Sequence, residues 1–368
     1  MMCRVPPDPP WEDATNRVKA IEFVVVHVET DTGIVGVGMT YSVDVGGSAI
    51  KSLVDDYLAN MVIGRDPLNT EANWVHMARQ MRRLGVGANA MAIAAIDIAL
   101  WDIKGKFYGQ PLYRLLGGAR PMIPAYASGI DLGDTLDELL QRVERFLSRG
   151  YRIVKIKIGR DTIAEDIERI CAVKEKIGEP ARLMVDANQK WSTAEAIRHC
   201  SALDDLDLEW IEEPLVFDDV DGHVQLKRNT RTPIALGESL HGKAQFLNYL
   251  RRDAVDIVQA DVAFVGGITE WIKIAHLAEA FNRPIAPHFM MELSTHLLCG
   301  VPNGYLLEDV EGGGLSDLGL LKQPIRVTNG MAVPADRPGH GIIFDRDALK
   351  RHEVDPSDLR SIDARGSK

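Results

Sequence analysis

The chain has 368 residues, of which 46% are hydrophobic and 26% are charged, and its formal net charge at pH 7 is −11. This composition is typical of a globular protein, and the length suits a barrel of roughly 200–250 residues joined to a smaller domain. The negative charge argues against nucleic acid or an anionic membrane as a partner. An acidic ligand can still bind where a metal ion or lysines reverse the charge locally.

The cysteines and the N-terminus both indicate an intracellular protein. The four cysteines show no C-x-x-C spacing and are interpreted as free thiols of a reducing compartment: Cys3, Cys171, Cys200 and Cys299. The first residues contain no apolar signal segment, and no apolar run approaches the ~18 residues of a membrane span. We therefore expect a cytoplasmic location.

The first third of the chain has a mixed α+β pattern. The β-rich runs IEFVVVHVET and IVGVGMTYS flank an Asp-Thr-Gly turn, which predicts a hairpin. Helical patterns follow at 48–60, 70–82 and 88–108, and the last is apolar on almost every side, which predicts burial between two domains. We expect residues 1–120 to form an N-terminal α+β capping domain.

From residue 121 short apolar runs alternate with amphipathic stretches. The apolar runs are MIPAYAS, RIVKIKI, RLMVDAN, LEWIEEP, PIALGES, AVDIVQAD, PIAPHF and GYLLED. Eight strands that alternate with helices predict parallel βα units, and the glycine-rich EGGGLSDLG replaces a helix after the last strand. We expect an α/β fold with a modified TIM barrel, (β/α)7β, over 121–320, and a C-terminal segment, 321–368, that packs back on the capping domain.

Carboxylates follow three consecutive strands of the predicted barrel. They are Asp186, Glu212 and Glu238, and 26 residues separate each from the next. Because the C-terminal ends of neighbouring barrel strands converge on one face, we expect these side chains to meet. Three carboxylates without His or Cys form a hard oxygen site that suits Mg²⁺ with open positions. Strand alternation should turn Glu213 away from Glu212, so Glu213 is interpreted as a supporting or structural residue.

Two lysines, Lys155 and Lys157, lie on the second strand in VKIKIG. Alternation along a strand points both side chains to the same face, towards the barrel mouth. Two adjacent ammonium groups oppose each other's charging. We therefore expect one of them to have a lowered pKa and to act as a base.

Asp261 and His288 follow two later strands, in VQAD and APH, and lie 27 residues apart. This spacing makes an Asp–His pair available, in which the carboxylate fixes the imidazole tautomer and keeps the ring basic enough for proton transfer. Glu308 lies on the eighth strand, where it would donate or accept a hydrogen bond at the substrate. His241 follows Glu238, and we expect it at the surface or at the border of the site.

The chain resembles the mandelate racemase subgroup of the enolase superfamily over essentially its whole length. The matching motifs are AIDIALWDIKGK, VKIKIG, VDANQ, WIEEP, GES, ADV-x-x-VGGIT and PHFMMELSTH. The muconate-lactonising subgroup instead carries a lysine on the sixth strand, where this chain has Asp261, and enolase itself lacks the K-x-K pair. Family members usually open with an edge strand before a proline-rich loop. This chain starts almost inside that loop, so we expect the strand to be absent or to precede Met1, and the loop to be poorly anchored.

The resemblance implies roles for the motif residues. Lys157 would be one base, and His288 with Asp261 would be the acid or base on the opposite face of the substrate. The three strand-end carboxylates would bind one Mg²⁺ per subunit. Proton abstraction next to a carboxylate would then give an enediolate, whose charge the metal ion would stabilise.

Residues on both domains are expected to contact the substrate. The resemblance implies that Lys155, Asn188 and Glu308 contact it from the barrel. Specificity should depend on loops of the capping domain, where Trp11 and Tyr41 either contact the substrate or only pack. Polar residues in these loops suit a polyol chain: Asp13, Asn16, Ser42 and Asp44.

Members with both a K-x-K pair and an Asp–His pair look like acid-sugar dehydratases, and VDANQKW is similar to the galactarate/talarate dehydratase type. We expect a hydro-lyase that dehydrates an aldonate or aldarate to a 2-keto-3-deoxy acid. One alternative is a racemase or epimerase of a 2-hydroxy acid. Another is a catalytically silent metabolite-binding regulator, which loss of a metal ligand or of Lys157 would mark. Besides the carboxylate substrate, we expect partner copies in a homo-oligomer, from a dimer to an octamer.

Overall fold

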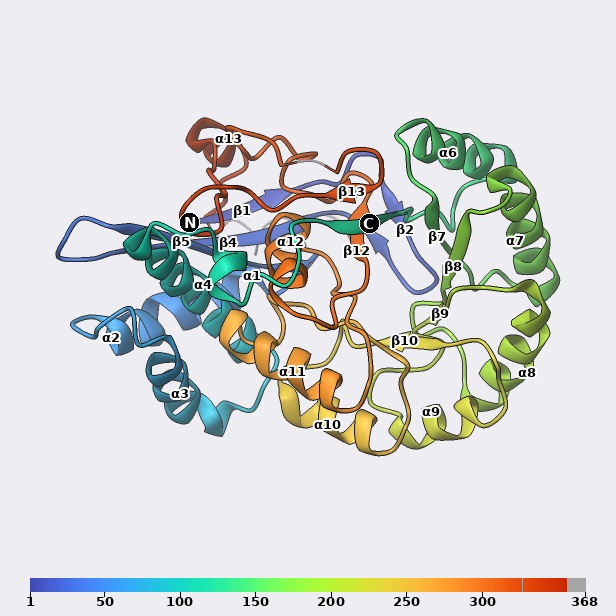
Figure 1. The fold of residues 1–368 in the computed structure, drawn as a ribbon, viewed down its shortest axis with the longest axis horizontal. Helices are drawn as coiled ribbons and strands as arrows, with labels where there is room; N and C mark the ends of the chain where they lie inside the picture. The colour runs from blue at the N-terminus through green and yellow to red at the C-terminus, as the bar shows by residue number, and fades with distance from the viewer. Residues whose placement is uncertain (326, 356–368) are drawn as a thin grey trace, which may run out of the picture.

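The computed structural model describes residues 1–325 and 327–355, and its first part is built on an antiparallel sheet (Figure 1). The sheet has the strand order β1–β4–β5, with bounds Met2–Val5, Ile21–Glu29 and Val35–Val43. Strands β4 and β5 form the predicted hairpin, in which Ile21 pairs with Val43. A short ribbon of β2 (Trp11–Glu12) and β3 (Arg17–Val18) lies in the loop between β1 and β4.

The expectation that the N-terminal edge strand is absent was wrong. Strand β1 pairs antiparallel with β4, with Met2 opposite Val24 and Val5 opposite Ile21. The strand is only four residues long, too short to show alternation before the prolines. The C-terminal segment holds its other side, since Arg4 N donates to His352 O and Val354 N donates to Met2 O. The loop that follows β1 is therefore anchored.

Helices cover the sheet of the first part. Their bounds are α1 Gly47–Leu53, the π-helical η1 Val54–Leu58, α2 Ala59–Val62, α3 Thr70–Met81, the 3₁₀ turn η2 Arg82–Leu84, α4 Ala88–Tyr108 and α5 Leu112–Leu115. These elements confirm the three helical patterns, the first of which runs unbroken through α1, η1 and α2. Helix α4 is buried along most of its length, because it packs on β5 and also contacts the barrel helix α11 (Ile268–Ala280).

Between residues 123 and 310 the chain forms the predicted barrel of parallel strands. The strands are β6 Ile123–Ser128, β7 Ile153–Lys157, β8 Arg182–Asp186, β9 Ile211–Glu212, β10 Ile234–Leu236, β11 Ile257–Val258 and β12 Leu307–Val310. They are ordered β11–β10–β9–β8–β7–β6–β12. Ile285, from the run PIAPHF, bridges Val258 on one side and Gly304 on the other, which closes the sheet between β11 and β12. Each of the eight predicted strand runs thus contributes to one curled sheet.

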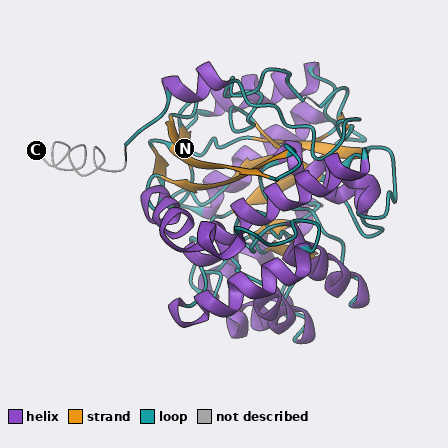
Figure 2. Cartoon of the chain, turned by 90° about the vertical axis from the view of Figure 1, so that its left-hand side faces the viewer, coloured by secondary structure: helices purple, strands orange, loops and turns teal. Residues whose placement is uncertain are grey.

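Seven helices surround this sheet among the described residues (Figures 1 and 2). They are α6 Leu136–Ser148, α7 Ile163–Ile177, α8 Thr193–Leu203 with the 3₁₀ turn η3 Asp204–Leu206, α9 Val220–Lys227, α10 Lys243–Arg251, α11, and α12 Met291–Gly300. No helix directly follows β12 in the described part of the chain, as the glycine-rich EGGGLSDLG predicts. The fold is therefore the expected (β/α)7β barrel with an N-terminal cap.

The described part of the C-terminal segment contacts both parts of the molecule. Strand β13 (Met331–Ala332) pairs antiparallel with β6 of the barrel. Gly339 bridges Pro111, and Glu353, just after α13 (Arg346–Arg351), bridges Cys3. The expectation that 321–368 pack against the cap also covers residues 356–368, which lie outside the described residues. The boundaries at residues 120 and 320 stay proposals.

Two further expectations concern the chain as a whole. All four cysteines are free, as their spacing predicted. No described helix is long and apolar enough to cross a membrane.

The contact between β5 and α4 depends on two glycines. A Cβ atom on Gly38 would lie 1.8 Å from Ala95 O, and one on Gly36 would lie 2.2 Å from Ala99 O. Only hydrogen at these positions allows the helix backbone to approach the strand so closely. The strand carries Tyr41 into the candidate site described below, so this packing also positions a side chain of that site.

We predict that Gly38→Ala lowers the free energy of unfolding by roughly 1–3 kcal/mol, because the added methyl group forces backbone to move. Chemical denaturation followed by circular dichroism measures this change. The control is Val35→Ala on the same strand, where the side chain is 37% exposed, and we expect a loss below about 1 kcal/mol. Equal losses in the two variants would contradict the proposed close approach.

Candidate active site

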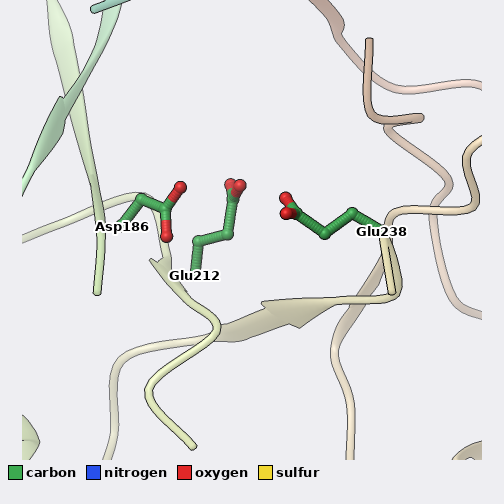
Figure 3. A group of neighbouring side chains, drawn as sticks. All are labelled: Asp186, Glu212 and Glu238. Carbon is green, nitrogen blue, oxygen red and sulfur yellow. The ribbon is translucent and has the colours of Figure 1, made fainter. Parts of the chain in front are cut away.

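Three carboxylates meet at the mouth of the barrel, as the sequence predicts (Figure 3). Asp186 ends β8, Glu212 ends β9, and Glu238 lies in the turn after β10. Each offers one oxygen, and the three oxygens lie within 4.8 Å of one another. Burial and the neighbouring carboxylates raise the pKa of Glu212 to about 8, although Lys155 opposes this rise. Crowded, buried carboxylates of this kind fit a hard divalent cation such as Mg²⁺.

Both lysines of β7 contact this carboxylate group. Lys155 Nζ lies 2.6 Å from Glu212 Oε1 and 2.8 Å from Glu308 Oε1, and Lys157 Nζ lies 2.5 Å from Asp186 Oδ2. All of these side chains are at least 95% buried. The prediction that strand alternation sends both lysines to the mouth is confirmed by these contacts.

The expectation that one lysine has a lowered pKa does not hold in this structure. Burial would lower the pKa of Lys157, but the carboxylates of Asp186, Glu212 and Glu238 together raise it. The pKa of Lys155 is raised in the same way, against burial, by Glu212 and Glu308. Our prediction counted the repulsion between the two ammonium groups and omitted the nearer carboxylates. A dication among these carboxylates would act in the opposite direction and favour the neutral lysine.

Asp261 and His288 form the predicted pair. His288 Nδ1 lies 2.8 Å from Asp261 Oδ2, and His288 Nε2 lies 3.6 Å from Glu238 Oε2. Burial would lower the pKa of His288, but Glu238, the hydrogen bond to Asp261 and Glu308 raise it to about 10. Ala263 N donates to Asp261 Oδ1 at 2.7 Å, so the carboxylate is held at both oxygens. Nε2 is the ring nitrogen directed towards the carboxylate group.

Tyr41 reaches this pair from the cap. It lies on β5, not in a loop, and is only 2% exposed. Its hydroxyl donates to Asp261 Oδ2 at 2.5 Å and lies 3.2 Å from His288 Nδ1. The expected loop position of Tyr41 was therefore wrong: the β-rich run IVGVGMTYS already includes Tyr41, and the strand continues to Val43. Its hydroxyl is already used by the Asp–His pair.

A cavity of about 470 Å³ opens onto these groups. Its wall includes Lys155, Lys157, Asn188, Glu308, His288, Trp11 and Tyr41. Of the four polar cap residues that we expected to suit a polyol chain, Asp13 and Asn16 line it, and Ser42 and Asp44 do not. Asn188 N donates to Asp186 Oδ1 at 2.8 Å, and Glu308 Oε2 accepts from Phe289 N at 3.1 Å. Trp11 Nε1 donates to Glu311 O, and its ring meets the edge of Phe289 at 6.2 Å between centroids. The structure thus gathers the predicted set around one cavity.

Glu213 differs in part from its interpretation. Its carboxylate accepts from Gln189 Nε2 at 2.8 Å, which suits a supporting residue, but Glu213 also lines the cavity. Strand alternation does not apply to it, because β9 ends at Glu212 and Glu213 has a φ of +39°. His241 is half-buried at the border, where its Nδ1 lies 2.9 Å from Phe264 O.

Two buried residues that support Glu212 were not predicted. Gln259 Nε2 lies 2.6 Å and Trp210 Nε1 lies 3.1 Å from Glu212 Oε2. A signal for Gln259 was present, since it precedes Asp261 by two residues in VQAD and therefore shares its direction. Trp210 precedes Glu212 by the same interval. Together with Lys155, these donors fix the orientation of the Glu212 carboxylate.

We predict that Mg²⁺ raises the melting temperature of the wild-type protein, because a ligand that binds only the folded state stabilises it. Glu238→Gln removes one carboxylate charge and should abolish most of this rise. Thermal melts with EDTA and then with excess Mg²⁺ measure the effect.

The matched control is Glu209→Gln, which changes a glutamate before β9, bonded to Tyr305 and Arg182. This variant should keep the full Mg²⁺-dependent rise. An equal rise in Glu238→Gln would remove Glu238 from the metal site.

The comparison with known proteins agrees with this geometry. Residues 1–117 match the family described as "Mandelate racemase / muconate lactonizing enzyme, N-terminal domain", and residues 138–348 match "Enolase C-terminal domain-like". The chain is 39% identical to a 3,6-anhydro-alpha-L-galactonate cycloisomerase of Streptomyces coelicolor, over 95% of this chain and 97% of the relative. It is 36% identical to an L-talarate/galactarate dehydratase of Salmonella typhimurium, over 90% of this chain and 82% of the relative.

A solved structure shares both the fold and the metal. The crystal structure of a racemase from Streptomyces coelicolor A3(2) with bound magnesium has a TM-score of 0.92 at 37% identity, and the match covers 96% of this chain and 98% of that chain. The present protein is an enzyme whose cofactor is Mg²⁺, in agreement with its cluster of carboxylates. The chain belongs to the mandelate racemase/muconate lactonizing enzyme family of the enolase superfamily.

Proposed function

We propose that this enzyme removes the proton α to the carboxylate of an acid sugar and then expels the oxygen at the β-carbon, giving a 2-keto-3-deoxy acid. One observation carries the proposal. Two separate proton-transfer groups line the same cavity beside the carboxylate group: Lys157, and His288, which Asp261 holds from behind the wall. Elimination needs a base for the α-proton and an acid for the departing oxygen, and the site holds a candidate for each.

The proposed ligands of Mg²⁺ are Asp186, Glu212 and Glu238. When bound, Mg²⁺ supplies positive charge close to the substrate carboxylate, where negative charge develops after the proton leaves. Lys155 adds a further positive charge and at the same time fixes Glu212 and Glu308. These charges are in place before the reaction, so the site does not need to reorganise as the enediolate forms.

In the proposed reaction the α C–H bond breaks and its proton moves to Lys157 or to His288. The β C–O bond then breaks, and a protonated group of the site returns a proton to the leaving oxygen. Asp261 holds His288 with Nε2 towards the cavity end that carries the carboxylates. The resulting enol rearranges to the 2-keto-3-deoxy acid. With a free β-hydroxyl the leaving group is water.

A second candidate is a ring-opening isomerisation. The Streptomyces coelicolor relative is a cycloisomerase of an anhydro-sugar acid, and the same elimination would open a ring when the β-oxygen is a ring ether. Racemisation of a 2-hydroxy acid needs the same two proton-transfer groups and stays an alternative. A catalytically silent regulator is disfavoured, because every predicted metal ligand and Lys157 are present. Assembly into a homo-oligomer also stays a prediction.

The reaction is tested by incubating the Mg²⁺-loaded enzyme with pentonic, hexonic, tetraric and hexaric acids and with 3,6-anhydro-hexonates. We expect a keto product from at least one of them, trapped as its semicarbazone. A product of unchanged mass identifies isomerisation, and a loss of 18 mass units identifies dehydration. Interconversion of 2-hydroxy acid enantiomers with no keto product from any acid would instead identify a racemase.

The two proton-transfer groups should be separable by hydrogen exchange in D₂O. With a substrate whose α-proton faces Lys157, we expect His288→Asn to exchange that proton while product formation falls by roughly 10²-fold or more. Lys157→Ala should lose the exchange. His241→Asn is the matched control, because His241 lies at the border and does not line the cavity. If neither His288→Asn nor Lys157→Ala alters exchange or turnover, neither residue transfers a proton in the reaction.

A further inference from the structure

The charges on the cavity wall are distributed unevenly. Three cations line it: Lys155, Lys157 and His288. Each lies against one carboxylate of the proposed metal site. The cap supplies Trp11, Asp13, Thr15, Asn16, Val18, Ile21, Tyr41 and Val43 to the wall. Among these cap residues the single charge is that of Asp13, and it is negative. Among the residues that the structure describes, the wall formed by the cap therefore offers no positive charge to a ligand.

Two cations lie near this wall and are engaged elsewhere. Lys190 Nζ donates to Ala14 O at 3.2 Å, so its ammonium group holds the cap loop. The side chain of Arg17 is 80% exposed and lies 3.9 Å from Glu12. Neither Lys190 nor Arg17 belongs to the cavity lining. The barrel side adds a further acid, Glu213, together with the amides of Asn188 and Gln189.

We propose that the enzyme acts on acid sugars with one carboxylate, such as aldonates or their anhydro forms, and discriminates against aldarates, which have two. This inference rests on the proposed function, which places the reacting carboxylate at the end of the cavity that holds the lysines. The remainder of the substrate then extends towards the cap.

The reason is repulsion without a compensating partner. A second carboxylate at the far end of the substrate would find no cation among the described residues of the cap wall and would approach the negative charge of Asp13. A terminal hydroxymethyl group carries no charge and can exchange hydrogen bonds with the amides of Asn16, Asn188 and Gln189. Family membership does not decide between monocarboxylates and dicarboxylates. The Streptomyces coelicolor relative is named for a galactonate derivative, and the Salmonella typhimurium relative is named for talarate and galactarate.

Asp13 also has a structural role, so a variant that tests its charge must keep the hydrogen bonds of its side chain. Its Oδ1 accepts from Thr15 N at 2.7 Å and from Asn16 N at 2.7 Å, and so forms the turn that shapes the cap loop. Asparagine supports the same turn through its amide oxygen. Asp13→Asn therefore removes the charge and keeps the loop.

The experiment compares kcat/KM of the Mg²⁺-loaded enzyme for pairs of acids that differ only at the far end, such as galactonate with galactarate and gluconate with glucarate, and for the corresponding pentose acids. For each configuration that is turned over, we expect the monocarboxylate to exceed the dicarboxylate by at least about tenfold. Equal or higher values for the dicarboxylates would overturn this inference and leave the proposed function standing. Absence of keto product from every acid, anhydro forms included, would overturn both.

The variants then test the cause. We expect Asp13→Asn to raise the ratio of dicarboxylate to monocarboxylate kcat/KM several-fold, because one repelling charge has gone. Asp31→Asn is the matched control: it removes another acidic charge of the cap, one that is exposed and outside the cavity lining, and the ratio should not change. If the two variants give the same ratio as the wild type, the charge on the cap wall does not select the substrate.

Discussion

The repulsion among three crowded carboxylates is the constraint on which the rest of the site depends. Asp186, Glu212 and Glu238 share a small volume at the barrel mouth, and water can compensate little of the charge of Asp186 and Glu212, which are fully buried. Removing a partner from such a group leaves an uncompensated buried charge, which is costly. This explains why β7, the strand beside β8, carries both Lys155 and Lys157, with an ammonium group against each of the two innermost acids. The lysines hold the site together as well as serving its proposed chemistry.

The cap is fixed on this site by contacts that the barrel alone cannot provide. Helix α4 fits against β5 because of the glycines on that strand, and it fits against α11 through Asp97, which accepts from both Thr269 N and Thr269 Oγ1. These two contacts determine where β5 and the loop between β1 and β4 cross the barrel mouth. The position of the cavity wall thus follows from packing at some distance from the cavity.

Most of the barrel and its carboxylates could be predicted from the sequence, because each strand end combines a buried run with a polar residue at a regular interval. Asp186 and Glu212 lie in β8 and β9, the strands that this rhythm predicts. What could not be predicted depends on contacts between distant segments. The partner of Tyr41 lies 220 residues away, and the four-residue strand at Met2 is recognisable only beside β4. The expected lowering of a lysine pKa was wrong for the same reason. The shift depends on the carboxylates of other strands that lie against each ammonium group, and these contacts cannot be read from the lysine strand alone.

The hydrogen bond from Tyr41 to Asp261 has a consequence for how such proteins can be recombined. The proposed acid–base unit of the barrel includes a phenol that belongs to the cap, so it is complete only when the two parts come from compatible sequences. A chimera that borrows the cap of a relative in order to change its substrate would also replace the third member of this unit. The cap is therefore not an interchangeable specificity module, and a graft has to carry the tyrosine with it.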